Sequence, residues 1–132
     1  MVAKVLIVED EFLVALELQE LLTGAGHTVV GLVQDQASLE KIGDAPQVAL
    51  VDVNLRDGPS GPRIARQLSH GFGTKIVYVT ATACQIDEPA ATAVGVVHKP
   101  FSEAAILSAV DFATNGGEGA PVPPGLKPLP LN

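Results

Sequence analysis

Acidic, hydroxyl and amino side chains stand at the ends of short apolar runs along this chain. These residues are Glu9, Asp10 and Glu11, then Asp52, then Thr80, and finally Lys99 followed by Pro100. Clustered carboxylates repel one another, so each is driven to take up a proton or to share a cation. A hard cation such as Mg2+ prefers carboxylate, carbonyl and water oxygens, and a lysine ammonium can reach a carboxylate or a phosphoryl oxygen. The residue types therefore predict a divalent-metal site beside a lysine, if the fold brings them together.

Apolar runs rich in β-branched residues are the predicted strands that carry these side chains. The runs are Lys4–Val8, Thr28–Val33, Val48–Asp52, Lys75–Thr80 and Gly95–His98. Runs without a polar face are typical of parallel strands covered by helices on both sides. Their alternation with helix-like stretches predicts an α/β, flavodoxin-like doubly wound parallel sheet of five strands in the order 2-1-3-4-5. In such sheets the functional site lies at the carboxyl ends of the strands, which is where the polar residues fall.

Helix signals fill the gaps between these runs. The predicted helices are Glu11–Ala25, a weaker one at Asp35–Ile42, Ser60–Leu68 and Ser102–Thr114. Ser60 and Ser102 are expected to cap their helices, because a serine oxygen can accept a bond from a free N–H in the first turn. The stretch 83–94 contains Pro89, which removes a helical hydrogen bond, so any helix there should be short and begin near Asp87.

Length and composition favour one acidic domain with a tail. The chain has 132 residues and a net charge of −7, which argues against direct binding to nucleic acid or an anionic membrane. Residues 1–115 are expected to fold as one domain. Residues 116–132 hold five of the ten prolines without apolar periodicity, so we expect a disordered extension. With the single Cys84, no signal-peptide pattern and no membrane-spanning run, a soluble cytoplasmic protein is expected.

Four motifs in chain order carry a resemblance to a known family. They are Val-Glu-Asp-Glu at 8–11, Asp52 with the following Val-Asn-Leu-Arg-Asp-Gly, Thr80-Ala81, and Lys99-Pro100-Phe101. Over roughly residues 4–114 the chain resembles the receiver domains of response regulators in two-component signalling. The resemblance implies a single-domain regulator that accepts a phosphoryl group from a histidine kinase or a histidine phosphotransfer protein. It would then signal to a downstream protein by contact, or serve as a phosphate shuttle or sink.

The same resemblance implies a role for each site residue. Asp52 would be the phosphoacceptor, Thr80 would hydrogen-bond the phosphoryl group, and Lys99 would form an ion pair with it. Mg2+ would be held by Asp10, by Asp52 and by the backbone carbonyl of Asn54, with Glu9 acting through a water molecule. A receiver catalyses its own phosphorylation and dephosphorylation, so we do not expect an enzyme with a separate substrate.

One position departs from the family pattern and keeps other functions open. Val96 stands three residues before the lysine, where receivers commonly carry Tyr or Phe, so an aromatic switch at that place is absent. A pseudo-receiver that binds partners without being phosphorylated is therefore an alternative. A metal-dependent hydrolase with Asp52 as nucleophile is another. A nucleotide site is disfavoured, because the first strand ends in carboxylates where a phosphate cradle needs glycines.

The first predicted helix carries two leucines outside its apolar stripe. The stripe is formed by Val14, Leu18, Leu21, Leu22 and Ala25. Leu13 and Leu16 lie off it and close to the acidic residues, so they are a candidate docking patch for a partner's helices.

Overall fold

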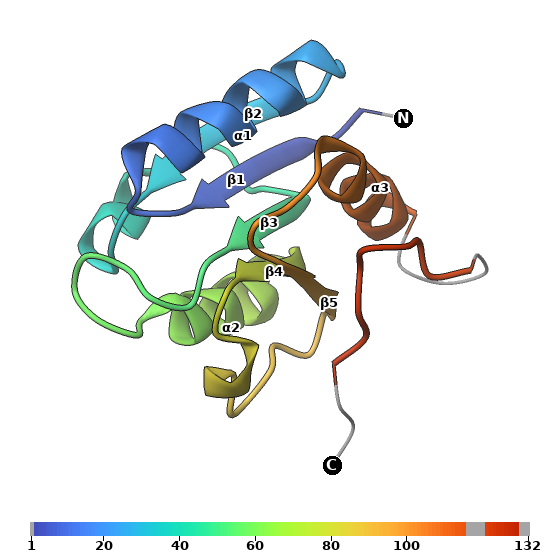
Figure 1. Ribbon diagram of the computed structural model, residues 1–132. Helices are drawn as coiled ribbons and strands as arrows, with labels where there is room; N and C mark the ends of the chain where they lie inside the picture. Colours follow the sequence, from blue (N-terminus) through green and yellow to red (C-terminus); the bar gives the residue numbers. More distant parts are fainter. Residues whose placement is uncertain (1, 116–120, 130–132) are drawn as a thin grey trace.

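The computed structural model describes residues 2–115 and 121–129, with a parallel sheet between helices (Figure 1). The strands are β1 (Lys4–Val8), β2 (Thr28–Val33), β3 (Val48–Val51), β4 (Lys75–Thr80) and β5 (Ala93–His98). The α-helices are α1 (Phe12–Gly24), α2 (Gly61–Phe72) and α3 (Glu103–Thr114), and the short 3-10 helices are η1 (Ala37–Lys41) and η2 (Ala83–Gln85). Among the described helices, none is both long enough and apolar enough to span a bilayer.

The sheet has five parallel strands in the order β2-β1-β3-β4-β5, which confirms the predicted fold. Helices α1 and α3 cover one face of it and α2 covers the other (Figure 1). Successive side chains of a strand point to opposite faces, so each central strand contributes side chains to the apolar cores on both faces of the sheet. Val5 and Ile7 of β1 join the cluster with α1 and α3, whereas Leu6 and Val8 join the cluster with α2.

The helix boundaries follow the predictions at α1 and α3 and depart from them at α2. Ser102 caps α3 as expected, since its Oγ accepts a hydrogen bond from the Ala105 N–H at 3.1 Å. Ser60 is the N-cap residue of α2, as predicted, but its side chain makes no capping hydrogen bond. The Ser60 hydroxyl donates to the Asp57 carboxylate instead of accepting from the helix, and α2 extends four residues beyond the predicted Leu68, to Phe72.

Two predicted helices are reduced to short 3-10 turns. The stretch 35–42 holds only η1. The chain just before η1 is held by the Asp35 carboxylate, which accepts a hydrogen bond from the Ser38 N–H at 2.8 Å. In the stretch 83–94 the only described helical turn is η2, so the prediction of a helix beginning near Asp87 is wrong. There the Ala90 N–H, which follows Pro89, donates to the Tyr78 hydroxyl at 3.0 Å.

Part of the predicted tail lies against the sheet. Of residues 116–132, for which disorder is predicted, residues 121–129 lie beside β5 (Figure 1). Lys127 forms an antiparallel bridge with Val96, and Leu126 is only 3% exposed because it packs into the cluster between the sheet and α3. Residues 116–120 and 130–132 lie outside the described part of the chain.

Candidate functional site

The ends of four parallel strands bring the predicted site residues together. The backbone hydrogen bonds between strands continue one residue past the strand ends. The Glu9 N–H donates to the Val33 carbonyl at 2.8 Å, and the Asp52 N–H donates to the Val8 carbonyl at 2.9 Å. Likewise the Lys99 N–H donates to the Thr80 carbonyl at 3.1 Å, just before a cis Lys99–Pro100 bond. Because their main chains are tied into the sheet, these side chains leave it from fixed positions.

Lys99 is the cation at the centre of the site. Its Nζ lies 2.6 Å from Glu9 Oε1 and 2.9 Å from Asp52 Oδ2. Glu11 is farther away, at 3.8 Å, and its side chain is 65% exposed. Glu11 is the residue directly before the first residue of α1.

Three carboxylates form a potential metal-binding cluster. One oxygen each from Glu9, Asp10 and Asp52 lies within 4.8 Å of the other two. Glu9 and Asp52 are buried, at 2% and 7% exposure, whereas Asp10 is intermediate. A single lysine ammonium faces up to three negative charges, so the donor set and its excess charge suit a hard divalent cation.

Burial sets the protonation behaviour of the cluster. Removal from water raises the pKa of Glu9 from 4.5 to about 7, although the hydrogen bond from Lys99 opposes that rise. For Lys99, burial alone would lower the pKa, but the hydrogen bonds to Glu9 and Asp52 outweigh burial and raise it. The lysine therefore stays charged, while Glu9 is poised between its two forms near neutral pH.

Thr80 lines the same pocket as Asp10, Asp52 and Lys99. This hydroxyl side chain is 1% exposed, and its Oγ1 accepts a hydrogen bond from the Thr82 N–H at 3.1 Å. The Asn54 side-chain amide, which follows β3, donates to Thr82 Oγ1 at 3.1 Å and to Gln85 Oε1 at 3.0 Å. The sequence analysis placed Asn54 at the site but missed Gln85, because no local pattern shows that η2 folds back toward β3.

The backbone around Asp52 is tightly confined. Its Oδ1 accepts from the Val53 N–H at 2.7 Å, which orients the carboxylate. Gly61 lies so close behind it that a Cβ there would sit 1.8 Å from the Asp52 carbonyl oxygen. A glycine at the start of α2 thus allows the helix to support the chain carrying Asp52.

Three residues of β4 and β5 do not line the pocket that contains Asp10, Asp52 and Lys99. Val96, in the usual aromatic position, is buried at 3% exposure and contributes to the core with α2. Tyr78 is fully buried, with its hydroxyl bound to the Ala90 N–H, so it does not replace the missing aromatic switch. His98 is exposed and lines a different hollow.

Residues 5–111 match the response regulator receiver domain family, and the chain belongs to that family. The chain is similar to the phyllosphere-induced regulator PhyR of Methylorubrum extorquens, with 31% sequence identity. The match covers 86% of this chain but only 44% of that relative, so the chain spans less than half of its length.

Solved structures of receiver domains have the same fold. The receiver domain of PhyR from Erythrobacter litoralis is 28% identical, with a TM-score of 0.74, over 90% of this chain and 94% of that one. The N-terminal domain of a response regulator/sensory box/GGDEF protein from Carboxydothermus hydrogenoformans is 30% identical, with a TM-score of 0.70. That match covers 85% of this chain and 94% of the other. The resemblance read from the sequence motifs is therefore confirmed at the level of family and fold.

Proposed function

We propose that this receiver is switched by phosphorylation of Asp52, with Thr80 and Lys99 as partners of the phosphoryl group. The observation that carries the proposal is the lysine ammonium bound to the Asp52 carboxylate at 2.9 Å within a cluster of acids. Membership of the receiver family supports the same reading. The donor would be a phosphohistidine of a kinase or phosphotransfer protein, and the receiver would act in the cytoplasm.

The reaction is a transfer between a nitrogen and a carboxylate oxygen. An oxygen of Asp52 forms a bond to phosphorus while the P–N bond of the phosphohistidine breaks, and the leaving imidazole keeps the electron pair. The Lys99 ammonium would pair with the phosphoryl oxygens, and the Thr80 hydroxyl would donate a hydrogen bond to one of them. The chain's contribution is thus positioning and charge compensation, which dominate phosphoryl transfer.

Asp10 and Asp52 would hold Mg2+ together with the Asn54 carbonyl, and Glu9 would act through a water molecule. When bound, the ion would neutralise the repulsion between the carboxylates and the incoming phosphoryl oxygens. The fit is supported by carboxylate oxygens within 4.8 Å of one another and by a cluster whose acids outnumber its lysine. Because the group that is phosphorylated and dephosphorylated would be the chain's own Asp52, we propose a switch and not an enzyme with a separate substrate.

The phosphodonor would dock beside the site on α1. The side chains of Phe12, Leu13 and Leu16 are 64%, 79% and 37% exposed. Glu11 directly precedes Phe12 in the chain, and Val14 of the same helix lies in a shallow depression with Lys99. An apolar helical surface next to a phosphorylation site suits the helices of a kinase or phosphotransfer protein, as the sequence pattern predicted.

Incubation with acetyl phosphate tests the proposal directly. The wild type with Mg2+ should gain one phosphoryl group by intact-mass measurement, and Asp52→Asn should gain none. Asp44→Asn is the matched control, since Asp44 is 66% exposed and is paired with Lys4, outside the carboxylate cluster. Failure of the wild type to form an adduct would favour the pseudo-receiver, and sustained phosphate release from unrelated phosphate esters would favour the hydrolase.

A further inference from the structure

The last strand of the sheet is paired on its outer edge by the C-terminal segment. β5 is the edge strand beside β4, and the Val96 N–H donates to the Lys127 carbonyl at 2.8 Å. The Lys127 N–H donates back to the Val96 carbonyl, also at 2.8 Å. An edge strand with free N–H and C=O groups is a template for an added strand, and here this chain supplies one.

The backbone of β5 is shaped to accept that strand. Gly95 has a φ of 154°, and a Cβ on it would lie 2.6 Å from the Lys127 carbonyl oxygen and 2.9 Å from the Leu126 side chain. Leu126 packs into the cluster on the α3 side of the sheet, whereas Leu129 packs against the cluster on the α2 side. The segment therefore holds the sheet edge by one backbone pair with a leucine on either face.

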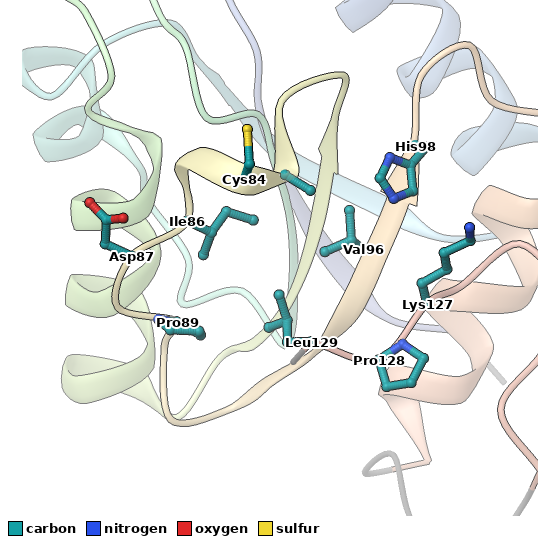
Figure 2. Close-up of a pocket in the computed structure, with 10 residues that line it drawn as sticks. Cys84, Ile86, Asp87, Pro89, Val96, His98, Lys127, Pro128 and Leu129 are labelled. Atoms are coloured by element: carbon teal, nitrogen blue, oxygen red, sulfur yellow. The ribbon is translucent and has the colours of Figure 1, made fainter. Parts of the chain in front are cut away.

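A hollow beside this edge receives the end of the segment. Its walls come from three parts of the chain: η2 with the loop after it, strand β5, and the tail (Figure 2). The lining residues are Ala83, Cys84, Ile86, Asp87, Pro89, Val96, His98, Lys127, Pro128 and Leu129. In Figure 2, Ile86, Val96 and Leu129 gather around its centre. The hollow exists because the crossover from β4 to β5 contains only a 3-10 turn, so no full helix covers this end of the sheet.

We propose that the edge of β5 and this hollow form a binding surface for an extended segment of a partner protein, and that residues 126–129 are a cis-acting competitor for it. The partner segment would follow the pattern of the tail itself, with two apolar residues flanking a backbone pair to Val96. A proline before the second apolar residue is compatible, since Pro128 lacks an N–H and the bridge uses only the Lys127 N–H.

The geometry suits a removable occupant. The described segment holds the edge through two backbone hydrogen bonds and one nearly fully buried leucine, a much smaller contact than a helix of the core makes. Its covalent tether gives it a high effective concentration, so a free partner segment competes poorly until the tail's hold is weakened.

The surface is connected to the site through η2. Asn54, beside Asp52, holds η2 through Thr82 and Gln85, while Ala83 of the same turn lines the hollow. A phosphoryl group on Asp52 that drew the Thr80 side chain toward itself would stretch the hydrogen bond that Thr80 Oγ1 accepts from the Thr82 N–H, and so loosen one wall of the hollow. This coupling rests on the proposed function, whereas the binding surface itself does not.

A peptide of residues 121–129 with blocked ends tests the surface in trans, with the full-length 15N-labelled protein as receptor. Leu126→Asp should release the tail and bind the peptide at least tenfold more tightly than wild type, with shifts at the Gly95 and Val96 amides. Val122→Asp is the control, because Val122 lies in the same segment but is 46% exposed, so this variant should bind like wild type. If Leu126→Asp fails to fold, Lys127→Pro removes the same pairing by deleting its N–H.

The competing outcomes are distinct. Equal affinity for all the proteins, or no binding to a folded variant whose tail is released, would overturn the proposal. Addition of beryllofluoride with Mg2+ to wild type should raise the peptide affinity at least threefold. Shifts around Asp52 without that rise would overturn the coupling and leave the proposed function standing. If beryllofluoride causes no shifts around Asp52, the proposed function is contradicted. The peptide affinities of the tail variants would then be the test of the binding surface.

Discussion

Replacement of Lys99 by methionine should destabilise the metal-free protein, with a deficit that Mg2+ partly removes. Methionine keeps an apolar stem but removes the ammonium that lies 2.6 and 2.9 Å from two buried carboxylates. Glu9 and Asp52 would then face each other with oxygens no more than 4.8 Å apart. At an effective dielectric of about 20, two unit charges at that separation repel by about 3.5 kcal/mol.

The measured loss should be smaller than this repulsion, because Glu9 can escape it by taking up a proton. Its pKa is about 7 even with the lysine present, so protonation of Glu9 near neutral pH has a low cost. We therefore expect a loss of about 2 kcal/mol at pH 8 in EDTA, and less at pH 6. With excess Mg2+, a second cation shares the carboxylates, and at least half of the loss should disappear.

Urea denaturation followed by far-UV circular dichroism measures these differences. Lys4→Met is the matched control, since Lys4 forms an ion pair of 3.6 Å with Asp44 in which the two side chains are 52% and 66% exposed. An exposed pair of this kind contributes about 0–1 kcal/mol. A Lys99→Met variant that is no less stable than the control, or equally destabilised in EDTA and in Mg2+, would refute the reasoning.

Other perturbations have defined outcomes. The folded protein holds a proton on Glu9 more tightly than the unfolded chain does, because its pKa is raised to about 7. The resulting stabilisation is complete below about pH 4.5 and is lost as the pH rises through about 7, so the free energy of unfolding in EDTA should fall from pH 6 to pH 8. Glu9→Gln should flatten that fall in urea titrations. Gly61→Ala should destabilise the fold by about 3 kcal/mol and reduce adduct formation, because its Cβ would meet the Asp52 backbone. The double variant Leu13→Ala, Leu16→Ala should slow phosphotransfer from a histidine kinase, while acetyl phosphate phosphorylates it as fast as wild type.

Matched controls separate these effects from general damage. Glu20→Gln removes an exposed carboxylate and should keep the wild-type pH dependence. At Gly71, also in α2, a Cβ would meet nothing within 4 Å, so Gly71→Ala should be neutral or stabilise by about 0.5–1 kcal/mol. Leu32→Ala shortens a leucine on β2 that is 39% exposed, and its phosphotransfer should match wild type. Equal slowing of the α1 double variant with both phosphodonors would contradict docking on α1.

The strand framework and the site were predictable because both follow from local patterns. Buried parallel strands are apolar on both faces, so their ends are marked by the first polar residue, as at Glu9 and Asp52. Since parallel strands share one carboxyl edge, residues more than 40 positions apart could be expected to meet. The 2.6 Å contact between Lys99 and Glu9 is the outcome of that rule.

Tertiary contacts decided the parts that the sequence did not reveal. Residues 121–129 have no apolar periodicity, yet Leu126 is buried because Gly95 leaves room for it on β5. In the crossover from β4 to β5, the hydroxyl of Tyr78 accepts the N–H of Ala90 and replaces a helical bond. Both depend on partners distant in sequence, which neither propensity nor spacing can identify.

The most direct measurement of the central claim is the location of the phosphoryl group after reaction with acetyl phosphate and Mg2+. Borohydride reduces an aspartyl phosphate to homoserine, and peptide mass spectrometry then identifies the modified residue. Reduction at Asp52 alone is the predicted result. Modification at Asp10 or Glu9 instead, or at no carboxylate in a folded wild-type protein, would contradict the account.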